Sequence, residues 1–328
     1  MKRSFPVFPM AILLYVLLAL LCLLSGPARL SLPQIWAGLL GEDPTAHAIL
    51  FSIRLPRLLG ALLSGAALSV SGVILQGVLG NSLASPGTVG VNAGAGLFAA
   101  VTLAIFPWAA AYLAPLAFVG AVAALALILL FDRVSGRGRA TLILAGVAVS
   151  AFFGALTSAV TLLFPDSFAA YAAFSLGSLE GVSLATLWLP AILVAVGLAL
   201  AFVFAPTVSA LSLGDGLASS LGVRVRASRS LLLLLACLLA AASVAVAGLL
   251  GFVGLIVPHV CRLFTGQNVR RQVCLAPLAG GILVCGADLA GRCVFAPSEI
   301  PVGVLLSLVG APFFVFLLIG RRNRHVDL

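Results

Sequence analysis

The sequence is poor in charge. Only 18 of its 328 residues are lysine or arginine, and 9 are aspartate or glutamate. Soluble domains carry about 25% charged residues, whereas here the charged fraction is 8% and the hydrophobic fraction is 62%. The mean hydropathy is +1.26. Most of the surface therefore cannot face water, which excludes a soluble globular protein.

The sequence also lacks stretches in which polar and apolar residues alternate, as the strands of a transmembrane barrel must. Backbone groups in lipid are then satisfied within helices. About 20 helical residues cross a hydrocarbon core about 30 Å thick, so 328 residues leave room for about ten crossings. The apolar runs predict spans at 7–26, 55–80, 87–106, 112–132, 140–164, 185–205, 230–250, 257–266, 274–292 and 302–320. We predict an all-α polytopic membrane protein, with a single transmembrane domain over residues 1–328.

Helix breakers modify two of these spans. The run 257–266 is too short to cross alone, so it must continue from a broken backbone near Gly251 and Gly254 that is buried in protein. The polar stretch 80–87 predicts a turn, with the next helix beginning at Pro86 or Gly87.

The N-terminal stretch 1–26 has a basic start and an apolar continuation, as a signal peptide has. Its apolar part, Val7–Leu24, is long for a signal peptide, and further spans follow it. We therefore expect a retained first helix.

Catalytic and metal-binding patterns are absent from the sequence, which has no H-E-x-x-H, no G-x-S-x-G and no P-loop. The six cysteines include no C-x-x-C pair and fall mostly in apolar runs, so we expect small buried hydrophobes. His259 alone cannot form a metal site, and hydrogen bonding at a helix end is its expected role. We expect no cofactor, no bound metal and no enzymatic activity.

Ionisable residues near the membrane midplane, which ion-coupled transporters need, are scarce. Asp288 is the clearest exception, and Arg292 follows four residues later on the same helical face. We expect a structural ion pair. A secondary transporter or an intramembrane enzyme is therefore disfavoured and stays as an alternative.

The basic residues are distributed unevenly over the two sides of the predicted spans. Fourteen of them fall on the side of the N-terminus, and Arg29, Arg54, Arg57 and Arg292 fall on the other. Cytoplasmic loops are the richer in lysine and arginine, so both termini are predicted to be cytoplasmic. Topology and anionic membrane lipid account for the net charge of +9, and nucleic acid need not be invoked.

The segment Leu213–Arg229 is amphipathic, because Leu213, Leu217, Leu221 and Val225 recur every four residues. It is too short to span lipid, and it predicts a small cytoplasmic helix that lies in a partner's groove. An ordinary interfacial loop is the alternative. Glycines between residues 60 and 96 predict close packing of helix backbones.

Three blocks of sequence resemble the membrane permeases of type II ABC importers, which carry iron–siderophore complexes, haem or cobalamin. The first begins with R-L-P-R at 54–57 and ends with G-A-G at 94–96, and the second is L-G-V at 221–223. The third runs from Gly248 to Arg292 and closes with E-I-P-V-G at 299–303 and G-A-P-F at 310–313. The resemblance covers residues 50–320 approximately.

The resemblance implies a homodimer of ten-helix permeases around a translocation path. Two cytoplasmic ATP-binding subunits would supply the energy, and a periplasmic or lipid-anchored binding protein would deliver the cargo. A prokaryotic cell membrane is the implied location. A ferric siderophore is the commonest cargo of the family, and haem and cobalamin stay open.

The resemblance also implies roles for individual residues. Arg54, Arg57 and Arg292 are expected to be exposed on the outer side and to dock the binding protein, with headgroup anchoring as the alternative. Coupling to the ATPase, in about 207–228, is assigned to Gly214, Asp215, Gly216, Ala218, Leu221, Gly222 and Val223. The translocation path or gate is assigned to Gln76, Asn81, Pro86, Gly90, Ser150 and Phe174, the last of which stands where relatives usually have Trp. Structural roles are assigned to Gly251, Pro258, His259 and Asp288.

Overall fold

The computed structural model describes residues 7–28, 30–106, 108, 112–135, 139–294 and 298–322, and this part of the chain contains helices but no strand. Ten longer helices match the ten predicted spans. They are α1 (Val7–Leu24), α4 (Leu55–Leu79), α5 (Val91–Ile105), α6 (Leu113–Ser135), α7 (Arg139–Leu163), α9 (Leu184–Val203), α12 (Val225–Ala247), α13 (Val253–Thr265), α14 (Val269–Cys293) and α15 (Val302–Arg322). Seven of the helices searched are long and apolar enough to cross a membrane, and Val91–Ile105, Val253–Thr265 and Val302–Phe316 are shorter apolar helices. The predicted fold class is confirmed.

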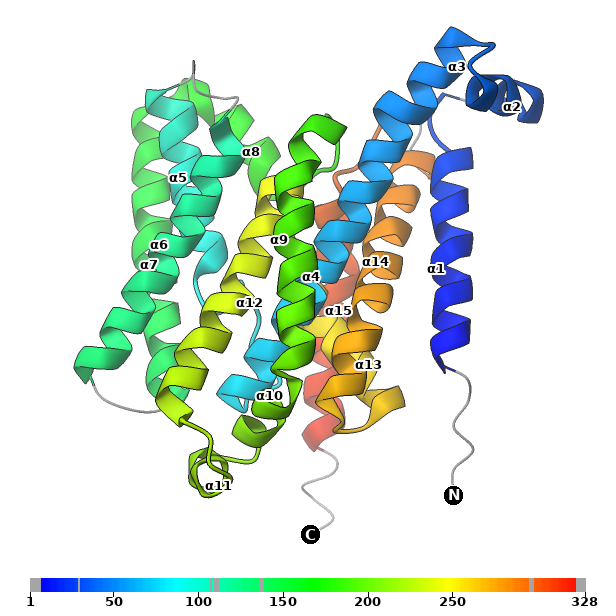
Figure 1. Ribbon diagram of the computed structural model, residues 1–328. Coiled ribbons are helices and arrows are strands. Elements are labelled where there is room, and N and C mark those ends of the chain that lie inside the picture. The colour runs from blue at the N-terminus through cyan, green and yellow to red at the C-terminus, as the bar shows by residue number, and fades with distance from the viewer. Residues whose placement is uncertain are drawn as a thin grey trace.

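Shorter helices lie at the two ends of the bundle. Figure 1 shows α10 (Ala205–Ser212) and α11 (Asp215–Ser220) at the end where α1 begins and α15 finishes. At the opposite end lie α2 (Leu32–Leu40), α3 (Pro44–Ala48) and α8 (Phe168–Leu176). A π-helical turn, Ile49–Arg54, joins α3 to α4, and a 3-10 turn, Pro165–Ser167, precedes α8.

Helix α4 lies in the centre of the bundle, and its glycines let it approach two neighbours with no side chain between. A Cβ added to Gly65 would overlap the backbone of Gly280 in α14, and a Cβ on Gly280 would overlap Gly65. A Cβ on Gly72 would likewise overlap Gly254 in α13. Burial of apolar surface gives no net drive between helices in lipid, so this close packing holds the helices together.

The backbone is broken between α12 and α13, as the short eighth span predicts. Residues 248–252 are not helical, and Gly251 lies in this stretch, whereas Gly254 lies inside α13. Phe252 precedes α13 with a φ of 63°, which is the left-handed region that non-glycine residues rarely enter. Its ring packs where a Cβ on Gly310 of α15 would stand, so the neighbouring glycine makes room for this conformation.

The predicted start of the third span at Pro86 or Gly87 is wrong. Helix α5 begins at Val91, because residues 85–90 form turns instead. The Ser85 amide donates to Thr88 Oγ1 at 2.9 Å, and Gly90 adopts a φ of 85°. Glycine supports this left-handed conformation, and the helix starts directly after it.

Candidate functional site

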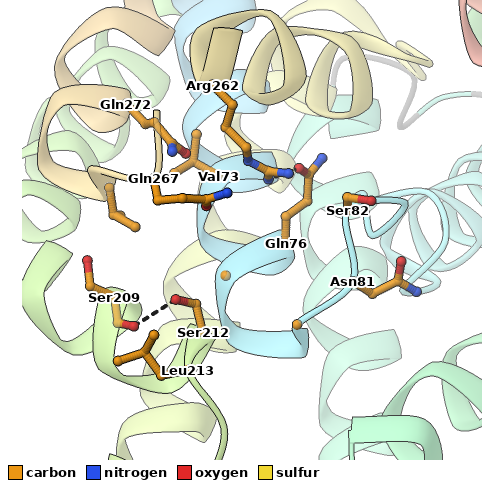
Figure 2. A pocket seen from close by; sticks show the side chains of 13 residues that line it. Val73, Gln76, Asn81, Ser82, Ser209, Ser212, Leu213, Arg262, Gln267 and Gln272 are labelled. Carbon is orange, nitrogen blue, oxygen red and sulfur yellow. Dashed lines mark hydrogen bonds between the residues drawn. The ribbon is translucent and has the colours of Figure 1, made fainter. Parts of the chain in front are cut away.

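A polar cavity lies at the end of the bundle that carries α10 and α11. It measures about 550 Å³ and is bounded by the end of α4, the following turn, α10, and the junction of α13 with α14. Its lining consists of Val73, Gln76, Gly77, Gly80, Asn81, Ser82, Ser209, Ser212, Leu213, Arg262, Gln267, Val269 and Gln272. Figure 2 shows the side chains of Arg262 and Gln76 pointing toward one another.

The Gln76 side chain is held in place by a backbone carbonyl that Pro258 leaves unpaired in α13. Pro258 has no N–H, so the carbonyl of Gly254, four residues earlier, cannot receive its usual helical hydrogen bond. The side-chain Nε2 of Gln76 donates to this carbonyl at 3.2 Å, and Gln76 Oε1 accepts from Arg262 Nη2. The buried amide therefore satisfies the carbonyl that the proline exposes, and it links α4 to both halves of α13.

The chemistry of the lining is that of neutral donors and acceptors around one cation. Amides come from Gln76, Asn81, Gln267 and Gln272, hydroxyls come from serines, and Arg262 supplies the positive charge. Such a surface hydrogen-bonds an oxygen-rich or anionic molecule. Among the described residues no group of three or more His, Cys, Asp or Glu side chains could hold a metal ion.

The structure separates the residues that we assigned to the translocation path. Gln76 and Asn81 line the polar cavity, and Pro86 packs close to Gly254. Gly90 faces Ser150 and Gly146 of α7, so these residues form a contact between helices. Phe174 of α8 lies at the other end of the bundle, beside a second cavity of about 470 Å³. Sequence reasoning did not assign Ser209, Ser212, Gln267 or Gln272, whose polarity at span ends was the available signal.

The expected exposure of the three arginines is wrong. Arg54, Arg57 and Arg292 are 3%, 9% and 3% exposed. Asp288 of α14 accepts from Arg57 Nε at 2.9 Å and forms an ion pair with Arg292 Nε at 3.1 Å, which confirms the predicted pairing of Asp288 with Arg292. Glu299 contacts Arg57 Nη1 at 2.7 Å. Buried charges are stable only with such partners, and the docking role stays a prediction.

The Arg54 guanidinium caps the C-terminal end of helix α1. Its Nη1 donates to the carbonyls of Leu23 and Leu24 at 2.7 and 2.8 Å, and its Nη2 donates to Ala28 O at 2.6 Å. The last carbonyls of a helix lack intrahelical partners, so the guanidinium replaces water there. The partners lie about 30 residues earlier in the chain, which no local pattern reveals.

The segment to which we assigned coupling forms the predicted small helix, α11. Leu213, Leu217 and Leu221 are exposed, and Ala218 is buried against the rest of the protein. Asp215 forms an ion pair of 2.5 Å with Arg229 at the start of α12, and Val223 N donates to Ala218 O. Gly214 and Gly222 adopt positive φ at the two ends of α11, whereas a Cβ on Gly216 would meet open space. The helix is therefore fixed to α12 and presents leucines outward.

The remaining predicted residues have packing roles. Pro258 is buried in α13. His259 lies in the middle of α13, with its ring 6.0 Å from that of Phe313, so its expected place at a helix end is wrong. Four cysteines are buried, as expected, whereas Cys274 and Cys293 are exposed.

Comparison with known proteins gives one consistent answer. The FecCD transport family matches residues 13–320. The iron(3+)-hydroxamate import permease FhuB of Bacillus subtilis is 38% identical over 325 residues, covering 94% of this chain and 84% of that protein. The Fe(3+) dicitrate transport permease FecD of Escherichia coli is 38% identical over 321 residues, covering 95% and 99%.

A haem-related protein and a solved structure are similarly close. The hemin transport permease HmuU of Yersinia pestis is 37% identical over 320 residues, covering 96% of this chain and 95% of that protein. A metal-chelate type ABC transporter in an inward-facing conformation has a TM-score of 0.86 and 30% identity, and the match covers 96% of this chain and 98% of that one.

Proposed function

Because this chain belongs to the FecCD transport family, we propose that it is the membrane permease of an ATP-driven importer whose cargo is a ferric siderophore. That it is a permease of an ABC importer for iron complexes, and a transport subunit rather than an enzyme, follows from the family and its relatives. The relatives are named for iron(3+)-hydroxamate, Fe(3+) dicitrate and hemin. The choice of a ferric siderophore among these cargoes is therefore our proposal.

The chemistry of the polar cavity supports a siderophore. A ferric siderophore presents many oxygen atoms, which the amides, the hydroxyls and Arg262 can hydrogen-bond. Haem presents a broad apolar face and takes axial His, Tyr, Met or Cys ligands, and none of these residue types is among the described residues that line the cavity. We place the cavity on the cytoplasmic part of the translocation path.

Uptake by the intact transporter tests the cargo. The complex is isolated from host membranes through a tag on this chain, reconstituted in vesicles with ATP inside, and offered radioactive ferric hydroxamate, ferric dicitrate, hemin or cobalamin. ATP-dependent uptake of ferric hydroxamate is expected, and uptake of hemin or cobalamin alone would refute the siderophore. Gln272→Leu should slow uptake, whereas Cys274→Ser, an exposed neighbour on α14, should not.

We also propose that α11 couples this chain to a cytoplasmic ATP-binding subunit. The exposed leucines offer an apolar ridge, and Gly216 leaves space beside it for a partner. Gly222 is a poor test position, because its φ of 82° makes any side chain strain the backbone. Gly216→Leu avoids this strain, and it should block co-purification of the ATP-binding subunit.

Gly286→Leu is the matched control for Gly216→Leu. Gly286 is also helical with open space around its Cβ position, but it lies in α14. Equal loss of the ATP-binding subunit in both variants, or in neither, would contradict the role of α11.

The assembly and orientation follow the same proposal. Two copies of the chain would surround the path, both termini would be cytoplasmic, and a binding protein would dock at the end that carries α2, α3 and α8. The charge asymmetry of fourteen to four supports this orientation. The docking role of Arg54, Arg57 and Arg292 would require them to exchange internal partners, so docking should depend strongly on salt.

A further inference from the structure

We propose that α2 is an interfacial helix, whose uncharged apolar face inserts among the phospholipids of the leaflet at the end of the bundle opposite α11. This inference depends on the chain being a membrane protein and does not depend on its cargo.

Helix α2 has well-defined ends, which the sequence itself provides. Ser31 and Gln34 form a capping box at its start, where Ser31 N donates to Gln34 Oε1 at 2.9 Å. Gly41 ends the helix with a φ of 79°, and Glu42 N donates to Ala37 O at 2.8 Å. These caps stabilise α2 without any contribution from lipid.

The helix is also fixed to the rest of the protein. Ile35 and Gly38 are buried, and a Cβ on Gly38 would stand 2.8 Å from the Cβ of Ala46 in α3. The ring nitrogen Nδ1 of His47 lies 2.9 Å from Gly38 O, and Asp43 Oδ1 caps α3 by accepting from Thr45 N at 2.9 Å. The two short helices thus form one packed unit that continues into α4.

The free face of α2 is apolar and without charge. Leu32, Trp36, Leu39 and Leu40 follow the spacing i, i+4, i+7 and i+8, so they share one side of the helix. Leu32 is 75% and Trp36 is 66% exposed, and the two other leucines are more than half exposed. Residues 32–40 contain no ionisable side chain. A partner recognised by charge finds nothing to bind here.

Position in the bundle identifies the occupant as lipid. Figure 1 shows α2 projecting sideways, just beyond the end of α1. Helix α1, which precedes α2 in the chain, exposes Leu13, Leu17, Leu20, Leu21 and Leu24, so α2 follows a helix whose apolar surface the bilayer covers. Tryptophan is enriched at the membrane–water boundary, where its ring reaches both phases. A helix of this kind buries its apolar face about 5–10 Å into the headgroup region.

Tryptophan fluorescence tests the proposal. The chain has three tryptophans, so Trp108→Phe with Trp188→Phe leaves Trp36 as the sole emitter. The variant is reconstituted in phosphatidylcholine vesicles, with or without bromine on the acyl chains. Brominated lipid should quench Trp36 strongly, aqueous iodide should quench it weakly, and neither salt nor added anionic lipid should change this, because the face is uncharged.

Two matched variants calibrate the measurement. Trp188, exposed on the spanning helix α9, serves as sole emitter for full contact with lipid. Glu42→Trp, in a background without the native tryptophans, places the ring on an exposed turn just beyond α2 for contact with water. The proposal expects Trp36 to resemble the first variant in quenching by bromine.

Three results would overturn the proposal. Iodide quenching equal to that of the position 42 variant, without bromine quenching, would show that the face is in water. Bromine quenching that disappears when a soluble binding protein is added would show a protein docking surface. Quenching that changes with the ratio of protein to lipid would show contact with a second copy.

Discussion

Removing the charge of Asp288 should destabilise the protein strongly, because this carboxylate is paired with two buried arginines. At an effective dielectric constant of about 20, charges about 3 Å apart attract by roughly 5–6 kcal/mol, and burial of the ions offsets much of this. Removing one partner of a buried ion pair costs about 3–5 kcal/mol, since the other charge stays buried. Asp288→Asn leaves Glu299 for Arg57, but among the described residues no carboxylate is left to pair with Arg292.

A thiol-reactive dye provides the assay. Cys22, Cys237, Cys261 and Cys285 are buried and react only when the protein unfolds, and Cys274→Ser with Cys293→Ser removes the two exposed thiols. In detergent, Asp288→Asn should lower the midpoint of thermal labelling well below that of the parent. Asp166→Asn, at an exposed position before α8, is the matched control and should not lower it.

A double variant tests whether Asp288 and Arg292 act as a pair. Arg292→Met removes the charge that Asp288→Asn leaves unpaired, so the double variant should be more stable than the two single effects predict by addition. Additive losses would show that the two residues do not act as a pair. Equal midpoints for Asp288→Asn and Asp166→Asn would refute the cost assigned to the buried charge.

Three further predictions use the same labelling assay or proteolysis. Gly280→Ala should lower the labelling midpoint, because the added Cβ overlaps the α4 backbone, and overpacking of this kind costs about 1–3 kcal/mol. Gly286→Ala on the same helix should not lower the midpoint, because its Cβ meets open space. Equal effects of the two substitutions would contradict the close contact. Gln76→Leu should lower the free energy of unfolding by about 1–3 kcal/mol, because it leaves the Gly254 carbonyl unpaired. The loss should be smaller in a Pro258→Ala background, where the backbone N–H of residue 258 can bond to this carbonyl. An unchanged loss would contradict the proposed role of Gln76 as the partner of the Gly254 carbonyl. Arg54→Gln should speed trypsin cleavage at the bond after residue 29, because the carbonyls of Leu23, Leu24 and Ala28 lose their charge-assisted hydrogen bonds. An unchanged rate would refute this.

Local sequence predicts the spans well and the partners of polar groups poorly. The ten spans could be predicted from the lengths of the apolar runs. The pairing of Asp288 with Arg292 could be predicted from their spacing of four residues on one helix. The burial of Arg57 could not, since Asp288 is 231 residues away. The polar cavity joins four segments in the same way, so Gln267 and Gln272 had no visible role until α4 and α10 were placed beside them.

Two local signals in the sequence indicate features that the apolar runs alone do not predict. Ser31 and Gln34 have the spacing of a capping box, and Gly41 follows as a helix stop, so α2 could have been predicted. The late start of α5 depended on Gly90, which precedes the helix in a left-handed conformation. Pro86 favoured a helix start at that position, but the hydrogen bond from Ser85 N to Thr88 stabilises a turn there instead.

The glycine contact between α4 and α14 limits how this protein can move. Helices separated by side chains can slide past one another as rotamers change, but at Gly65 and Gly280 the two backbones touch directly. Sliding or closer approach there would drive one carbonyl into the other helix, and separation would lose the direct contact. The two helices must therefore travel as one rigid body, and any rearrangement that opens a path to either side has to occur in the helices around this pair.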